Sequence, residues 1–119
     1  MNRELEMAKL ACRALDEKKG KDIKVIDIHE VSVIADYFVI ASASNQNQVQ
    51  AMVDNVDETL GRAGFEAKQI EGTRNSSWVL MDYGDMIVHV FDAENRLFYD
   101  LERIWRDGKV LDVNEFLEK

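Results

Sequence analysis

The sequence predicts an α/β domain in which a mixed sheet of about five strands is flanked by helices. Amphipathic helical segments alternate along the chain with short β-branched segments, and two of the β segments are joined only by Gly84 and Asp85. So short a connection makes that pair antiparallel, whereas crossovers through helices favour parallel pairs. The sheet is therefore expected to contain both kinds of pairing.

Apolar residues at helical spacing indicate a first helix within residues 1–20 and a second within residues 45–63. The apolar positions of the first helix are Met7, Leu10, Ala11, Ala14 and Leu15. Those of the second are Val49, Met52, Val53, Val56, Leu60 and Ala63. We expect Gly20 and Gly64 to end these helices, and Ser44 or Asn45 to cap the start of the second.

Two further helices are expected towards the end of the chain. The apolar positions of the longer one are Leu97, Leu101, Ile104 and Trp105. Asp92 is its candidate N-cap and Gly108 its expected stop. Asp112 and Glu115 resemble a capping box, which indicates a short final helix in the tail from residue 109 to 119.

Strands are expected where short runs of β-branched and aromatic residues occur. These runs are residues 23–28, 37–41, 67–71, 78–83 and 86–91, of which 67–71 is the weakest. If Gly84 and Asp85 form a tight turn, the last two runs make a hairpin. Its register then pairs Tyr83 with Met86 at the turn and Trp78 with Phe91 at the open end.

This register divides the hairpin side chains between the two faces of the sheet. The face expected to lie against helices carries Val79, Met81, Tyr83, Met86, Val88 and Val90. The opposite face, which we term the aromatic face, carries Trp78, Leu80, Asp82, Ile87, His89 and Phe91. Large aromatics mixed with a carboxylate and an imidazole are typical of protein-binding patches. The alternative is a structural face on which Trp78 and Phe91 stack under a covering helix, with Asp82 and His89 as a satisfied pair at its edge.

The charge of the chain bears on its partners. Its net charge is −8 and its pI is near 4.7, so RNA or DNA is repelled at long range and a basic protein is attracted. Acidic residues near the hairpin turn and after it are Asp82, Asp85, Asp92, Glu94, Asp100 and Glu102. With Trp78 and Tyr83 they form a candidate socket for Lys or Arg of a partner. A solvated acidic surface is the alternative.

The chain has one cysteine and no zinc-ligand spacing, so neither an internal disulfide nor a zinc site is expected. No apolar run approaches the roughly 20 residues that span a bilayer, and residues 1–20 do not follow the signal-peptide pattern. We therefore expect a cytoplasmic protein that forms one domain over residues 1–119, with no cofactor and no membrane contact.

The sequence contains no G-x-S-x-G, G-x-G-x-x-G or P-loop motif. One enzymatic alternative is a nucleotide-dependent transferase that uses the turn from Ser42 to Asn45, where a phosphate could meet the amides of a helix N-terminus. Such an enzyme would also need some of Asp36, Asp82 or Asp85. A dimeric scaffold that associates through its aromatic face is a third possibility.

Three separated segments of the chain resemble one known family. The segments at residues 35–52 (ADYFVIASASNQNQVQAM), 78–91 (WVLMDYGDMIVHVF) and 96–105 (RLFYDLERIW) are together similar to the ribosomal silencing factors of the Iojap type. The resemblance covers residues 5–107 and leaves the tail from residue 109 uncovered. It implies a nucleotidyltransferase-like fold without the catalytic carboxylates, and a protein that is not an enzyme.

The resemblance also implies a function. Members of the family bind the large ribosomal subunit through its fourteenth protein, at the surface that meets the small subunit. They thereby oppose subunit joining and translation when nutrients are short, and they are commonly homodimers when free. The negative charge of this chain adds the expectation of little direct contact with nucleic acid. By match to the family motif W-x-L-x-D-Y-G-D and its continuation, the implied partner-binding residues are Trp78, Leu80, Asp82, Tyr83, Gly84, Asp85, His89 and Phe91.

Overall fold

The computed structural model describes residues 3–30, 33, 35–72, 78–92, 108–111, 113 and 117. The described elements, in chain order, are α1 (Arg3–Glu17), β1 (Lys21–Asp27), β2 (Tyr37–Ala43), α2 (Gln46–Arg62), β3 (Gln69–Glu71), β4 (Trp78–Asp82), β5 (Met86–Asp92) and β6 (Lys109–Leu111). The helix expected after Asp92 and the capping box expected at Asp112 and Glu115 fall outside the described residues.

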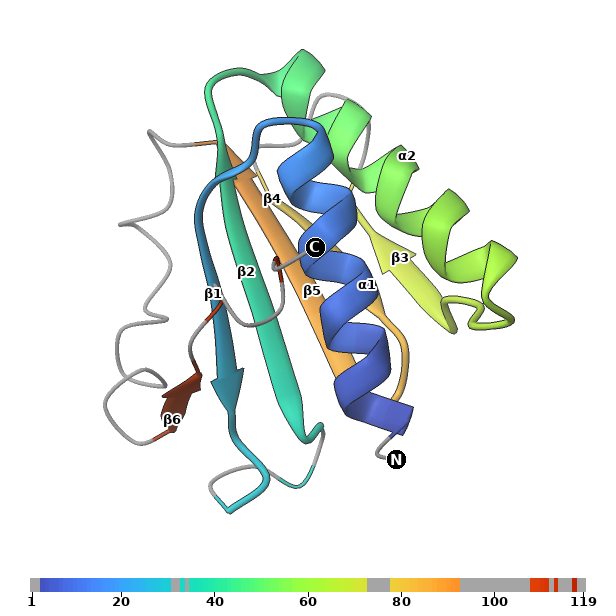
Figure 1. The fold of residues 1–119 in the computed structure, drawn as a ribbon. Helices are drawn as coiled ribbons and strands as arrows, with labels where there is room; N and C mark the ends of the chain where they lie inside the picture. Colours follow the sequence, from blue (N-terminus) through green and yellow to red (C-terminus); the bar gives the residue numbers. More distant parts are fainter. Residues whose placement is uncertain are drawn as a thin grey trace.

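The strands form a mixed sheet in the order β3-β4-β5-β2-β1-β6 (Figure 1). Strands β2 and β5 are parallel, while the other four neighbouring pairs among the described strands are antiparallel. The predicted α/β class with a mixed sheet is therefore confirmed. The structure adds a sixth strand, β6, which pairs with β1 and places Val110 opposite Ile26.

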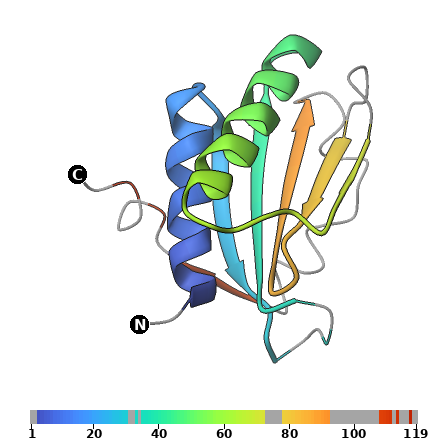
Figure 2. The same cartoon turned by 90° about the vertical axis from the view of Figure 1, so that its right-hand side faces the viewer.

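Both described helices cover the same face of the sheet, and Figure 2 shows them side by side there. Most of the predicted apolar positions form the core beneath them, with Leu15 of α1 and Met52 of α2 fully buried. Leu10 is only partly buried, and the prediction is wrong for Ala63, which is exposed at the C-cap of α2. Asn55 of α2 also donates a hydrogen bond to the carbonyl oxygen of Ala14 at 2.8 Å, which links the two helices. Neither helix is long and apolar enough to cross a membrane.

The two helix ends that meet above the sheet are tied to each other. Asn45 is the N-cap of α2, as predicted, and its Oδ1 accepts from the amide of Gln48 at 2.8 Å. The Gln48 side chain in turn accepts from the amide of Ser44 at 2.6 Å and donates to the carbonyls of Lys18 and Lys19, both at 3.0 Å. The turn between β2 and α2 is therefore fixed to the end of α1.

The predicted hairpin register is confirmed, because Trp78 pairs with Phe91 and Asp82 pairs with Ile87. At the turn the amide of Tyr83 donates to the carbonyl of Met86 at 2.9 Å. Gly84 has φ of +89°, a left-handed conformation that favours glycine, and its amide donates to Asp82 Oδ1 at 2.7 Å. The predicted helix-facing set of the hairpin is also confirmed, since all of its members belong to the core cluster formed with α1 and α2.

Candidate protein-binding surface

The aromatic face lies on the side of the sheet opposite α1 and α2. Alternate residues of β4 and β5 build it, and Phe38 and Ile40 of β2 and Ile26 of β1 extend it into a second buried cluster. Trp78 and Leu80 of β4 pack against the margin of this cluster and are themselves only partly buried. The sheet thus has an apolar layer on each side.

Exposure on the aromatic face depends on the strand. Phe91, His89 and Ile87 of β5 retain 0%, 3% and 6% of their accessible surface. The β4 residues Trp78, Leu80 and Asp82 are instead half-buried. The expectation of an open face is therefore wrong for β5, a central strand, and partial exposure belongs to β4, whose outer neighbour β3 has only three residues.

Four rings pack together on this face. Trp78 stacks on Phe91 with centroids 5.5 Å apart and an interplanar angle of 21°, and the Phe38 and His89 rings form a T-shaped contact with centroids 4.7 Å apart. The Trp78 indole N–H donates to His89 Nδ1 at 3.1 Å. The predicted Trp78–Phe91 stack is confirmed, but the alternative pair of Asp82 with His89 is wrong, because Asp82 accepts from the Gly84 amide instead.

Burial sets the protonation state of His89. Removal of the imidazole from water lowers its pKa to about 4, so the ring is neutral near pH 7. Because Nδ1 accepts the Trp78 hydrogen bond, the ring proton lies on Nε2. Among the described residues this buried Nε2 has no hydrogen-bond partner. His89 is consequently a hydrogen-bond acceptor within an aromatic cluster.

A small pocket adjoins the exposed edge of Trp78. Glu71, Gly72, Trp78 and Leu80 line it, and its volume is about 160 Å³. This is well below the ~300–1,000 Å³ of sites for drug-sized ligands, so it suits a single side chain of a partner. Gly72 has φ of +113°, and a Cβ there would lie 2.8 Å from the carbonyl oxygen of Trp78. Glu71 and Gly72 were not predicted as site residues, because residues 67–71 show only a weak strand pattern.

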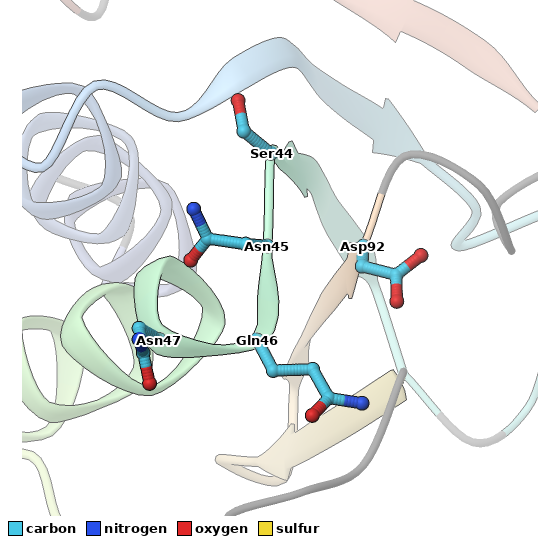
Figure 3. Close-up of a pocket in the computed structure, with 5 residues that line it drawn as sticks. All are labelled: Ser44, Asn45, Gln46, Asn47 and Asp92. Carbon is cyan, nitrogen blue, oxygen red and sulfur yellow. The ribbon is translucent and has the colours of Figure 1, made fainter.

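The turn considered for a transferase lies at a different place. A pocket of about 440 Å³ is lined by Ser44, Asn45, Gln46, Asn47 and Asp92 (Figure 3). Ser44 and Asn45 point away from Asp92 in Figure 3, and Ser42 is buried. Asp36 and Asp85 lie at the other end of β2, where the Asp36 amide donates to the Asp85 carbonyl.

Strand β2 has seven residues, which at ~3.3 Å each separate its two ends by roughly 20 Å. Asp36 precedes β2 and Ser44 follows it. The fold therefore does not bring together the turn and the carboxylates that the transferase alternative requires.

Comparison with known proteins identifies the family. The sequence profile of a family described as ribosomal silencing factor during starvation matches residues 1–119. The chain belongs to the ribosomal silencing factor family. A silencing factor of Bacillus subtilis is 37% identical over 106 residues, which cover 89% of this chain and 90% of that protein. The predicted family resemblance is confirmed.

One solved structure and one further relative by sequence are also similar to this silencing factor. A solved protein of Chromobacterium violaceum superposes with a TM-score of 0.84 at 34% identity, covering 88% of each chain. A mouse protein named mitochondrial assembly of ribosomal large subunit protein 1 is 30% identical over 94 residues, which cover 76% of this chain and 41% of the mouse protein.

The residues that the family motif implies for partner binding occupy four environments in this silencing factor. Trp78, Leu80 and Asp82 are half-buried on β4, and Gly84 and Asp85 form the hairpin turn, with Asp85 exposed. His89 and Phe91 are buried on the same face. Tyr83 lies on the opposite face against the helices, where burial raises its pKa above the ordinary value.

Proposed function

We propose that this silencing factor represses translation by binding the large ribosomal subunit through its fourteenth protein, at the surface that meets the small subunit. Bound there, it would block subunit joining sterically when nutrients are limiting, with no catalytic step. Family membership supports a ribosome-associated silencing role. The name of the mouse relative, which refers to the large subunit, supports that choice of subunit. The proposal includes a homodimeric free form and a cytoplasmic location.

The observation that carries the proposal is the partial exposure of Trp78 and Leu80 beside the Glu71–Gly72 pocket. Tryptophan is strongly enriched among the residues that dominate binding energy at protein interfaces. Trp78 is held by its stack on Phe91 and by its hydrogen bond to His89, so its ring is ordered before a partner arrives. Little side-chain entropy would then be lost on binding.

Charge supports a protein partner over bare RNA. The exposed Asp85 carboxylate stands at the hairpin turn, next to the strand that carries Trp78 and Leu80, and the chain as a whole has a net charge of −8. Such a surface attracts a basic ribosomal protein and is repelled by a polyanion. A modest affinity is enough to occupy the large subunit, because a protein present at ~100 times its dissociation constant stabilises the bound subunit by about 2.7 kcal/mol.

Co-sedimentation with isolated ribosomal subunits at low salt tests the proposal. We expect the protein to sediment with large subunits and not with small ones. Trp78→Ala should weaken binding by a factor of ~30, the equivalent of an interface anchor worth about 2 kcal/mol. Val110→Ala, which trims a 51% exposed side chain on β6 at the opposite edge of the sheet, is the matched control and should bind normally.

Circular dichroism of both variants separates loss of an anchor from loss of the fold. If the folded wild-type protein fails to sediment with large subunits at low salt, the proposal is wrong.

A further inference from the structure

We propose that His89 is a positioning residue, which orients the Trp78 indole for the ribosomal partner without touching the partner itself. The inference rests on the proposed function, because it assigns a role within the same surface. It also restricts which side chains of the partner can pack against Trp78. With its N–H already bonded to His89, Trp78 presents ring carbons, which suit an apolar side chain or a Lys or Arg stem.

The neighbours of His89 hold its imidazole in place, and the imidazole in turn orients the Trp78 indole. His89 lies on β5 between Ile40 of β2 and Leu80 of β4, and it is only 3% exposed. Its ring is parallel to Phe91, with centroids 6.1 Å apart and an interplanar angle of 2°, and it forms a T-shaped contact with Phe38 at a centroid distance of 4.7 Å. Neighbours on two sides thus restrain the ring, and Nδ1 is directed at the Trp78 N–H 3.1 Å away.

The side chain at position 89 needs a hydrogen-bond acceptor to hold the Trp78 N–H. The buried Nε2–H of His89 has no hydrogen-bond partner among the described residues, which lowers the stability of the folded protein. A phenylalanine ring would fill the same layer without an unsatisfied polar group. The feature of His89 that phenylalanine lacks is the Nδ1 acceptor. Since burial also keeps the ring neutral near pH 7, Nδ1 retains the lone pair that receives the indole proton.

Three substitutions isolate the acceptor. His89→Asn places an amide oxygen near the position of Nδ1, while His89→Gln extends its oxygen towards the position of Nε2. His89→Phe keeps an aromatic ring but removes the acceptor. If His89 positions Trp78, the asparagine variant should behave like the wild type, and the glutamine and phenylalanine variants should not.

The indole N–H resonances of the ¹⁵N-labelled free protein report the orientation of Trp78 directly, and Trp78→Phe assigns its signal apart from that of Trp105. We expect the Trp78 signal to shift and to exchange faster with water in the phenylalanine and glutamine variants, and to stay near its wild-type position in the asparagine variant. Affinity for isolated large subunits should fall about 3- to 10-fold in the phenylalanine and glutamine variants, as expected for loss of one hydrogen bond, and little in the asparagine variant.

Each result of these experiments either supports the role of His89 or overturns it. An unchanged Trp78 signal in the phenylalanine and glutamine variants would overturn the inference. The inference would also be overturned if the Trp78 signal shifts in these two variants while their affinity for large subunits stays at the wild-type level, provided that Trp78→Ala does weaken binding. If phenylalanine prevents folding, the asparagine–glutamine comparison alone carries the test. If Trp78→Ala binds normally, Trp78 is not an anchor and the inference is overturned, whereas failure of the folded wild-type protein to bind large subunits overturns the proposed function.

Discussion

Trp78 combines an internally bonded polar atom with a partly exposed ring. Its N–H is bonded to His89 and its ring stacks on Phe91, while part of its surface borders the Glu71–Gly72 pocket. A side chain so arranged is rigid and largely apolar where a partner can reach it. These are the properties that make tryptophan an effective anchor at protein interfaces.

The buried imidazole predicts a specific pH dependence of stability. The pKa of His89 is about 4 in the folded protein against an ordinary value of 6.5, so only the unfolded chain binds a proton there between these pH values. The contribution of the neutral ring is complete above pH 6.5 and is lost as the pH falls to 4. The loss is about 3 kcal/mol of unfolding free energy.

Urea unfolding at several pH values checks this sign and size. Between pH 7 and pH 4 the wild type should lose about 3 kcal/mol more than His89→Phe, which lacks the titrating group. The exposed His29 is common to both proteins, and its pKa is raised by Asp27, so it contributes equally to each. Parallel pH profiles for the two proteins would show that His89 is not buried in its neutral form.

At the residue scale, the sequence predicts which face a hairpin side chain occupies but not how much of it is exposed. The two-residue turn at Gly84 and Asp85 leaves a single register, so Tyr83 was correctly placed facing the helices and Trp78 facing away. The burial of His89 and Phe91 depends on what packs over β5 from elsewhere in the fold. That information is not contained in the local alternation of the strand.

At the scale of elements, Gly72, the residue after β3, lies against the backbone at the start of β4. Gly72 has φ of +113° and leaves no room for a Cβ beside the Trp78 carbonyl. Gly64 has φ of +92° but faces open space, so a residue with a Cβ there would meet only the backbone strain of the left-handed conformation. The two glycines form a natural pair for comparison.

Gly64→Ala should lower the unfolding free energy by about 1–2 kcal/mol through backbone strain alone. Gly72→Ala should lower it further, because the new methyl group meets backbone atoms that cannot move independently, and it should also shift the Trp78 indole resonance. Urea unfolding and the indole spectrum measure the two effects. Equal losses with an unmoved Trp78 signal would mean that the close approach at Gly72 is unimportant.

Element prediction succeeded where local signals were strong. The stripes of α1 and α2 and the Asn45 cap were identified from helical spacing and cap chemistry. Strand β6 was missed because Lys109–Leu111 has three residues, too few to show an alternation, and is defined by its pairing with β1. Short edge strands depend on the neighbour that pairs with them, so their own residues give little warning.

For the molecule as a whole, the negative charge should act on the rate of encounter with the ribosome. Asp85→Asn and Asp16→Asn each remove one exposed negative charge, one at the hairpin turn and one at the far end of α1. At low salt we expect Asp85→Asn to slow association with large subunits several-fold and Asp16→Asn to have little effect, because steering is strongest near the interface.

Stopped-flow association at increasing ionic strength provides the check. The difference between the two variants should vanish towards 1 M salt, where the Debye length is about 3 Å. If both variants slow association equally at low salt, the overall charge would be responsible and the location of Asp85 would be irrelevant.

The most direct measurement of the proposed silencing mechanism is subunit joining followed by light scattering. Large subunits are preincubated with the wild-type protein, with Trp78→Ala or with Val110→Ala, and small subunits are then added. Our account predicts that the wild type and Val110→Ala suppress the rise in scattering, while Trp78→Ala permits it. A normal rise with wild-type protein shown to be bound to the large subunit would contradict the account.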